Sequence, residues 1–379
     1  MTEPAYPPAR AVALKILPHF ARHLPTERQY NQRGLAPQPE AQDIEAIVEA
    51  AFWASLRRIE GYVPTISLAF VPPEQAGRPL KFEQSFPLAA EILTQLAPAV
   101  ERRGIHLGVW RERNELRIWG TTRMIPMLCF VLEVVAPGLL VIKHRRSSES
   151  TKFVNLAVLE GDQIKVIKHD AESQGHGPAI LGSLLGFESP GSPADSVNVF
   201  VELAVSMRAH GRGGSLLIVP EKTDTWRESI IRPVPYSVLP PFSELADLVR
   251  EQSREDRQRL WHEALRRVIE SIAGLTAVDG ATIITDQYEL LAFGAKIGRR
   301  QGSPRIENVV VTEPIDGMVA EIANPGQLGG TRHLSAAQFA QDQRDAFALV
   351  ASQDRRFTVF AWSPREEMVH AHRVETLLL

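Results

Sequence analysis

Cysteine is almost absent from this sequence, since Cys129 is the single one among 379 residues. A lone thiol excludes a disulfide within the chain, and its place inside the apolar run Pro126–Leu132 is typical of a small core residue. Long apolar runs are also lacking, because none reaches the roughly 18 residues of a membrane-spanning helix. Residues 1–9 do not show the basic-then-apolar order of a signal peptide. We therefore expect a cytoplasmic protein in a reducing compartment, with no membrane partner.

Excess positive charge is missing as well. The 42 Lys and Arg against 45 Asp and Glu residues give a formal net charge of −3. This balance provides no electrostatic argument for binding duplex nucleic acid. Hydrophobic residues (44%) and charged residues (23%) occur in the proportions of a soluble globular protein. The length favours two domains.

Pro-rich stretches and changes of pattern divide the chain into an N-terminal arm (1–37), a middle block (38–192) and a last block (193–379). The arm carries apolar residues at helical spacing over Ala11–Phe20. The middle block has an α+β pattern. We expect helices at Glu40–Ile59 and Pro87–Arg103, and strands at Thr65–Val71, His106–Trp110, Glu115–Trp119, Met127–Val135, Leu139–His144, Lys152–Leu159 and Gln163–Lys168.

A short acidic motif, Val278–Ala281, stands in the last block. It follows an apolar helix, Val268–Ala273, and opens an apolar strand, Ala281–Ile284. The carboxylate of Asp279 would therefore lie at the end of an element, where scaffolds place chemistry.

A Gly-rich turn, Gly329–Gly330, lies 50 positions after Asp279–Gly280 and leads directly into an Ala-rich helix that starts at Thr331. Glycine lets the backbone approach a ligand closely, and a helix start offers unpaired N–H groups and a positive dipole end. Thr331, Arg332 and His333 add a hydroxyl and two nitrogen-bearing side chains. This combination suits phosphate, so the two motifs together predict a nucleotide site.

Three short matches in the same order resemble one known domain. The helix Ser196–Ala209 and the strand in Gly214–Pro220 are similar to the opening of the DAC domain of bacterial diadenylate cyclases of the DisA and CdaA type. Asp279–Ala281 resembles its DGA motif, and Gly330–His333 resembles the first four residues of its GTRHR motif. The resemblance covers residues 193–379, and the block before it resembles the probable sensor domains of the type called DACNV.

The resemblance implies an α/β protein, with an α+β N-terminal domain followed by a DAC-like domain whose mixed central sheet is flanked by helices. It implies a sensor-coupled diadenylate cyclase that condenses two ATP molecules into cyclic di-AMP. In this family each protomer binds one ATP and two sites meet face to face, so we expect a homo-oligomer. A small effector of unknown identity would bind the N-terminal domain.

The resemblance also implies a role for individual residues. Asp279 would coordinate Mg²⁺ or Mn²⁺ and help to deprotonate the attacking 3′-hydroxyl, because hard cations prefer carboxylate oxygen. Arg332 and His333 would join Asp279 in catalysis, and Ser352 would lie near the adenine or the phosphates. The residues expected to contact the nucleotide are Gly280, Ala281, Gly329, Gly330, Thr331, Arg332, His333, Ser335 and Ser352.

Three positions depart from the family pattern. Leu334 replaces the second Arg of the family's motif, which removes one cationic contact to phosphate, and Val278 replaces the His that precedes DGA in the CdaA branch. Gln341 stands where an acidic metal ligand is expected. The Pro-, Gly- and charge-rich segment 298–327 lengthens the spacing between the motifs, which predicts an inserted strand or a lid over the ligand. Replacement charge is expected from this segment, at Arg299, Arg300 or Arg305.

Simpler interpretations stand beside these. Asp279–Gly280 alone is interpreted as a simple turn. With the second motif present, a role in the nucleotide site is favoured instead. His210–Gly214 precedes a strand rather than a helix, so a tight turn is favoured over a second phosphate loop. Lys143–Arg146 is favoured as a solvated strand end over a site for an anionic effector. The alternative to an enzyme is a catalytically inactive DAC-like module that binds a nucleotide as a sensor or signal, which Leu334 and Gln341 favour.

Overall fold

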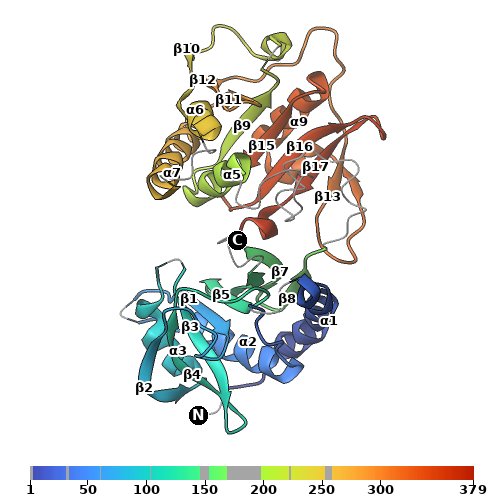
Figure 1. Ribbon diagram of the computed structural model, residues 1–379. Helices are drawn as coiled ribbons and strands as arrows, with labels where there is room; N and C mark the ends of the chain where they lie inside the picture. The colour runs from blue at the N-terminus through green and yellow to red at the C-terminus, as the bar shows by residue number, and fades with distance from the viewer. Residues whose placement is uncertain are drawn as a thin grey trace. The chain divides into compact units, whose positions relative to one another are not determined.

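The computed structural model describes residues 3–30, 34–59, 61–102, 104–145, 153–168, 198–221, 223–251 and 258–379, and it leaves out the side chains of 22–30 and 258–259. The chain divides into a first unit, residues 1–168 with Leu379, and a second unit, residues 169–378 (Figure 1). Each contains a mixed sheet and helices, which confirms the expected α/β fold. The expected boundary between residues 192 and 193 lies outside the described residues.

The first unit is built on an eight-stranded sheet in the order β2-β4-β3-β1-β5-β6-β7-β8, counted over its described residues. Alternate residues of β1 lie on its two faces: Leu68 and Phe70 pack with the helices, whereas Ala69, together with Val71 just after the strand, belongs to a smaller cluster on the other face. The elements are α1 (Pro7–Tyr30), α2 (Ala41–Ser55), β1 (Ile66–Phe70), β2 (Leu80–Pro87), α3 (Ala90–Leu96), η1 (Ala97–Ala99), β3 (His106–Glu112), β4 (Glu115–Thr122), β5 (Phe130–Ala136), β6 (Leu139–Arg145), β7 (Phe153–Glu160) and β8 (Gln163–Val166).

The N-terminal segment is part of the first unit's core. Helix α1 is longer than the predicted Ala11–Phe20, and its residues Val12, Ile16 and Phe20 are buried in the same cluster as the residues of α2. The predicted helix Pro87–Arg103 is shorter than expected, because α3 ends at Leu96 and a 3-10 turn follows.

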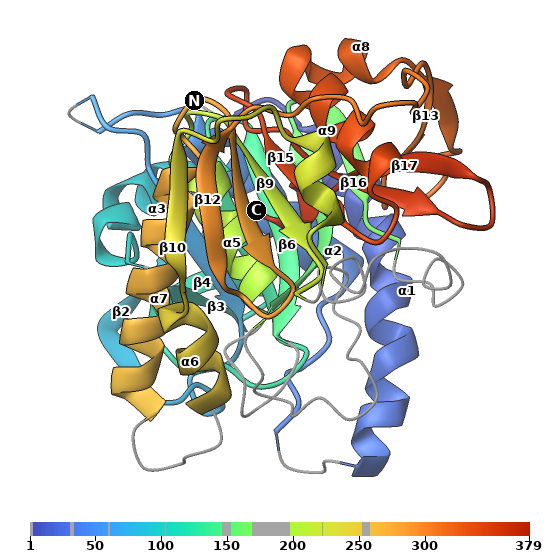
Figure 2. The ribbon, with the colours of Figure 1, turned by 90° about the horizontal axis from the view of Figure 1, so that it is seen from above.

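The second unit contains a nine-stranded sheet, again over the described residues, in the order β10-β12-β11-β9-β15-β16-β17-β13-β14. Strands β10 and β12 lie side by side at one edge (Figure 2). The strands are β9 (Gly214–Val219), β10 (Tyr236–Phe242), β11 (Ala281–Thr285), β12 (Leu290–Ala295), β13 (Val309–Thr312), β14 (Glu321–Ala323), β15 (Phe347–Ala351), β16 (Phe357–Ser363) and β17 (Met368–Arg373).

Helices cover both faces of this sheet. The strand β9 separates the layers, because Leu216 and Ile218 pack with α5 and α7 while Leu217 and Val219 pack with α9. The segment 298–327 contains β13 and β14, and β13 pairs with β17, so part of it extends the sheet. The helices and 3-10 turns of this unit are α5 (Val199–Ala209), η3 (Thr225–Ser229), α6 (Glu244–Arg250), α7 (Gln258–Leu275), α8 (Pro325–Gly329), α9 (Thr331–Asp342) and η6 (Glu375–Leu377).

Candidate functional site

The strand register brings the two motifs to one edge of the second unit's sheet. Strands β9 and β11 are parallel, with Ala281 opposite Ser215, so they begin at the same edge. Strand β15 runs antiparallel to β9, with Ala351 opposite Gly214, so it ends there. The acidic motif before β11, the turn before β9 and the residue after β15 therefore lie at the same edge.

Arg332, from the start of α9, reaches this edge. A Cβ placed on Gly213 would lie 2.7 Å from Nη1 of Arg332 and 3.3 Å from the carbonyl oxygen of Ala351. Gly213 also has a left-handed backbone, with φ +71°, which favours glycine. The turn His210–Gly214 thus packs closely against the guanidinium. Over the described residues Arg332 forms no ion pair, so its charge is available to an anion.

Asp279 lies exposed at the same edge, beside a cation. Nζ of Lys296 is 2.5 Å from Oδ2 of Asp279, and their side chains are 51% and 87% exposed. The hydrogen bond and the charge of Lys296 lower the pKa of Asp279, and the charge of Arg332 acts in the same direction. Ala281 is opposite Ser215, so Asp279 and Gly213 both lie two residues before the same pair, and Arg332 packs against Gly213.

Two glycines allow the contact between Asp279 and Lys296. Ala281 is paired with Ala295, so Gly280 and Lys296 continue two neighbouring strands beyond the same pair. A Cβ on Gly280 would lie 2.5 Å from the carbonyl carbon of Gly294, which leaves no room for a side chain. Gly280 also has φ +114°. Glycine at position 280 is therefore required by both space and backbone conformation.

His333 stabilises the turn before α9 from inside the core and does not point to solvent. His333 is 1% exposed, its Nδ1 lies 3.1 Å from the carbonyl oxygen of Gly329, and its ring contacts Phe360. A Cβ on Gly329 would lie 2.2 Å from the His333 ring. Burial lowers the pKa of His333, which favours the neutral ring. The sequence predicted contact with phosphate, but this conformation directs the ring into the core.

The remaining predicted residues are distributed around the edge. Thr331 is exposed at the first position of α9, Ser335 lies one turn further and is half-buried, and Ala281 is 1% exposed within the sheet. Ser352 directly follows β15, and its backbone N–H donates to the carbonyl oxygen of Arg356 at 2.9 Å. Gly330 has φ +77°, which suits the sharp entry into the helix.

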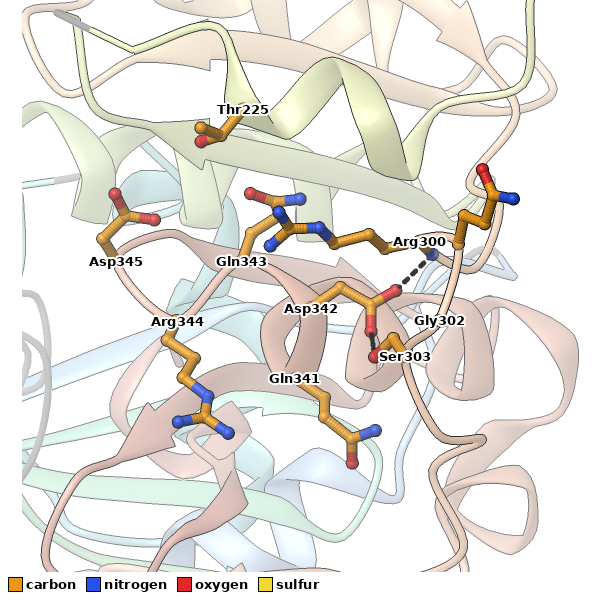
Figure 3. A pocket seen from close by; sticks show the side chains of 10 residues that line it. Thr225, Arg300, Gly302, Ser303, Gln341, Asp342, Gln343, Arg344 and Asp345 are labelled. Carbon is orange, nitrogen blue, oxygen red and sulfur yellow. Dashed lines mark hydrogen bonds between the residues drawn. The ribbon is translucent and has the colours of Figure 1, made fainter.

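The far end of α9 holds the beginning of the segment 298–327. The carboxylate of Asp342 accepts hydrogen bonds from the backbone N–H of Arg300 (2.8 Å) and from the hydroxyl of Ser303 (Figure 3). A hollow of about 660 Å³ opens there. The amide of Gln341 donates to the carbonyl oxygen of Pro304 at 2.9 Å, so it braces this segment.

Arg300, one of the arginines predicted to supply the replacement charge, lies far from the start of α9. Helix α9 has 12 residues and is roughly 18 Å long, since an α-helix rises about 1.5 Å per residue. Arg300 lies at its far end and forms an ion pair with Glu228 at 2.7 Å. Lys296, which the sequence interpretation missed, is the cation that lies beside Asp279.

The first unit carries a buried polar cluster on the sheet face away from its helices. Lys143, expected at a solvated strand end, is 8% exposed, and its Nζ lies 2.5 Å from Oε2 of Glu133. His106 is 2% exposed, and its Nδ1 lies 2.7 Å from the hydroxyl of Ser67. Burial lowers the pKa of His106 to about 4. The expectation of a solvated strand end is therefore wrong for Lys143.

The fit of a divalent metal rests on Asp279. In the part of the chain that the structure describes, no group of three or more His, Cys, Asp or Glu side chains is placed to hold a metal ion. Mg²⁺ is commonly bound through one or two carboxylates together with substrate phosphates and water. The exposed Asp279 carboxylate fits a metal that nucleotide phosphates also ligate, once Lys296 releases it.

Comparison with known proteins identifies part of the first unit. Residues 33–123 match the family described as "Probable sensor domain DACNV". The predicted resemblance to the DACNV type is thereby confirmed over that range, which includes α2, α3 and β1 to β4. No curated protein matches the chain. Among the described helices, none combines the length and apolar character needed to cross a membrane.

Proposed function

We propose that the second unit binds ATP at the edge formed by Asp279 and Arg332, and that the protein is a sensor-coupled diadenylate cyclase. The observation that carries this proposal is the meeting of two distant motifs, one with an exposed carboxylate and the other with a guanidinium that forms no ion pair with any described residue. The match of residues 33–123 to the DACNV type supports it. Probable sensor domains of this type precede some DAC domains.

The chemistry follows from the groups at the edge. Arg332, the hydroxyl of Thr331 and the first N–H groups of α9 hold the polyphosphate, since a helix start and a guanidinium both favour phosphate oxygens. Asp279 accepts the proton of the attacking 3′-hydroxyl. Each 3′-oxygen forms a bond to the α-phosphate of the other ATP, and the bond to the departing pyrophosphate breaks. Asp279 would hold a Mg²⁺ or Mn²⁺ ion, which would supply positive charge to the phosphates when bound.

His333 and the glycines act through position rather than contact. The buried ring of His333 holds the carbonyl of Gly329, which fixes the entry into α9 and with it the direction of Arg332. Two chains must face each other to close the dinucleotide ring, so the active form is a homo-oligomer. An effector bound by the first unit would regulate it.

A second candidate function is a nucleotide-binding module without catalysis. Its support is the ion pair between Lys296 and Asp279, which occupies the carboxylate that a metal requires. Gln341 adds no acidic ligand and is engaged with Pro304 at the other end of α9.

Product analysis separates these functions. Purified protein is incubated with ATP and Mn²⁺, and the nucleotides are identified by mass spectrometry. The cyclase predicts cyclic di-AMP from the wild type, none from Asp279→Asn and a normal yield from Asp316→Asn, which removes an exposed carboxylate from another loop. ATP binding without any dinucleotide product would favour the module, and absence of ATP binding would exclude both.

A further inference from the structure

Lys296 is held firmly at its backbone but not at its charged end. It follows the buried Ala295, and its carbonyl oxygen accepts a hydrogen bond from the backbone N–H of Ile231 at 2.8 Å. Its side chain is half exposed and contacts an even more exposed carboxylate. Ion pairs between exposed groups are weak because water and salt screen them, so this contact exchanges easily.

The site needs a second cation near Arg332 to bind a triphosphate. Arg332, which packs against Gly213, is a second cation at this edge, and Leu334, two positions later, carries no charge. Arg300 lies at the far end of α9, where its backbone N–H donates to Asp342, so it is remote from the start of the helix. A triphosphate carries several negative charges, so one guanidinium leaves most of them unmatched.

We propose that Lys296 is the second polyphosphate-binding cation of this site, and that Asp279 holds it there until a nucleotide arrives. On binding, the ammonium turns from the carboxylate to phosphate oxygens, which frees Asp279. Lysine suits this exchange because its compact charge sits on a flexible stem with three rotatable donors. This inference rests on the proposed nucleotide site and names a second residue that binds its phosphates.

The exchange predicts two effects of opposite sign. Lys296→Met removes a charge-assisted contact, so it weakens triphosphate binding in the absence of metal by about 10- to 100-fold. The same change removes the competitor of a cation at Asp279, so it strengthens the binding of Mn²⁺ alone by up to about fivefold. A residue with a purely structural role would not raise Mn²⁺ affinity.

The test measures both affinities on the full chain. Inorganic triphosphate is titrated by calorimetry in EDTA, and Mn²⁺ binding is followed by electron paramagnetic resonance without nucleotide. The variants are Lys296→Met, Lys296→Arg, which retains the charge and should keep triphosphate affinity within a few-fold of the wild type, and Arg266→Met as the control. Arg266 is an exposed cation within α7. Thermal unfolding checks each fold, and Lys296→Gln serves if Lys296→Met unfolds.

Weaker triphosphate binding with stronger Mn²⁺ binding in Lys296→Met, and unchanged values in Arg266→Met, would support the exchange. Wild-type triphosphate affinity in Lys296→Met would overturn the inference while leaving the nucleotide site standing. Loss of triphosphate affinity without a gain for Mn²⁺ would overturn the holding role of Asp279. A wild-type chain that binds neither triphosphate nor ATP would overturn the proposed function and the inference together.

Discussion

The close contact between Gly213 and Arg332 gives the sharpest test of the site's geometry. A methyl group at position 213 would overlap Nη1 of Arg332, which lies 2.7 Å from the position of that carbon. The guanidinium ends a flexible side chain and must move away. Gly213→Ala is therefore expected to displace the phosphate-binding charge without touching the phosphate itself.

Gly213→Ala is expected to have two effects, one on stability and one on ATP affinity. Alanine in a left-handed conformation costs roughly 1 to 2 kcal/mol of stability. Loss of a hydrogen bond to a charged group costs about 1.5 to 3 kcal/mol of binding free energy, or roughly 10- to 100-fold in ATP affinity. Gly211 separates these parts, because it has φ +64° in the same turn and a Cβ there would meet nothing within 4 Å.

Calorimetric ATP titration and urea unfolding of both variants provide the assay. Both variants should lose similar stability, and only Gly213→Ala should lose ATP affinity. The loss should not add to that of Arg332→Ala, since both changes remove the same contact. Equal ATP affinities of the two glycine variants would refute the placement of Arg332 against this turn.

Three further predictions concern other groups. Asp279→Asn should lower any dinucleotide synthesis at least about 100-fold, because it removes the charge needed in the transition state while preserving the shape of the side chain. Turnover is measured with Mn²⁺, and a wild-type rate for the variant would contradict this prediction. Leu334→Arg should leave ATP affinity unchanged or lower it, because Lys296 already supplies the charge, whereas a gain in affinity that shrinks as salt increases would show that the site still lacks this cation. The pKa of His106 falls from 6.5 in the unfolded chain to about 4 when folded, so the unfolded state binds the proton more readily between these values. The free energy of unfolding of the first unit should therefore decrease by up to about 3 kcal/mol as the pH falls from 7 to 4. His106→Gln should flatten this dependence in urea unfolding, and an unaltered pH profile would assign it to other groups.

Apolar runs identified two of the strands that carry the site, at Gly214–Pro220 and Ala281–Ile284. The strands β9, β11 and β15 lie where continuous Val, Ile, Leu and Ala residues occur, because they are central and buried on both faces. The edge strands β2 and β10 were not predicted. Most of their side chains are exposed, so no apolar alternation marks them.

The orientation of His333 was predictable from helical spacing. His333, Ala336, Ala337 and Ala340 follow the i, i+3, i+4, i+7 pattern of one helix face, and all four are buried. Arg332 is one position earlier, so it points about 100° away and reaches the edge of the sheet. The motif resemblance concealed this signal, because it grouped the neighbouring residues as phosphate contacts.

Long-range pairing determines the features that the sequence interpretation missed. Lys296 meets Asp279 only through the pairing of β11 with β12, which includes two irregularities in register. Lys143 is buried because β6 lies between β5 and β7, where its neighbour Glu133 on β5 neutralises it. Neither pairing leaves a local pattern in the sequence.

Titration of ATP into the wild type and Arg332→Ala tests the central claim most directly. The account predicts binding to each wild-type chain and a loss of about 10- to 100-fold in affinity for the variant at equal salt concentration. Wild-type affinity in Arg332→Ala, or no binding of ATP to either protein, would contradict the nucleotide site at this edge of the sheet.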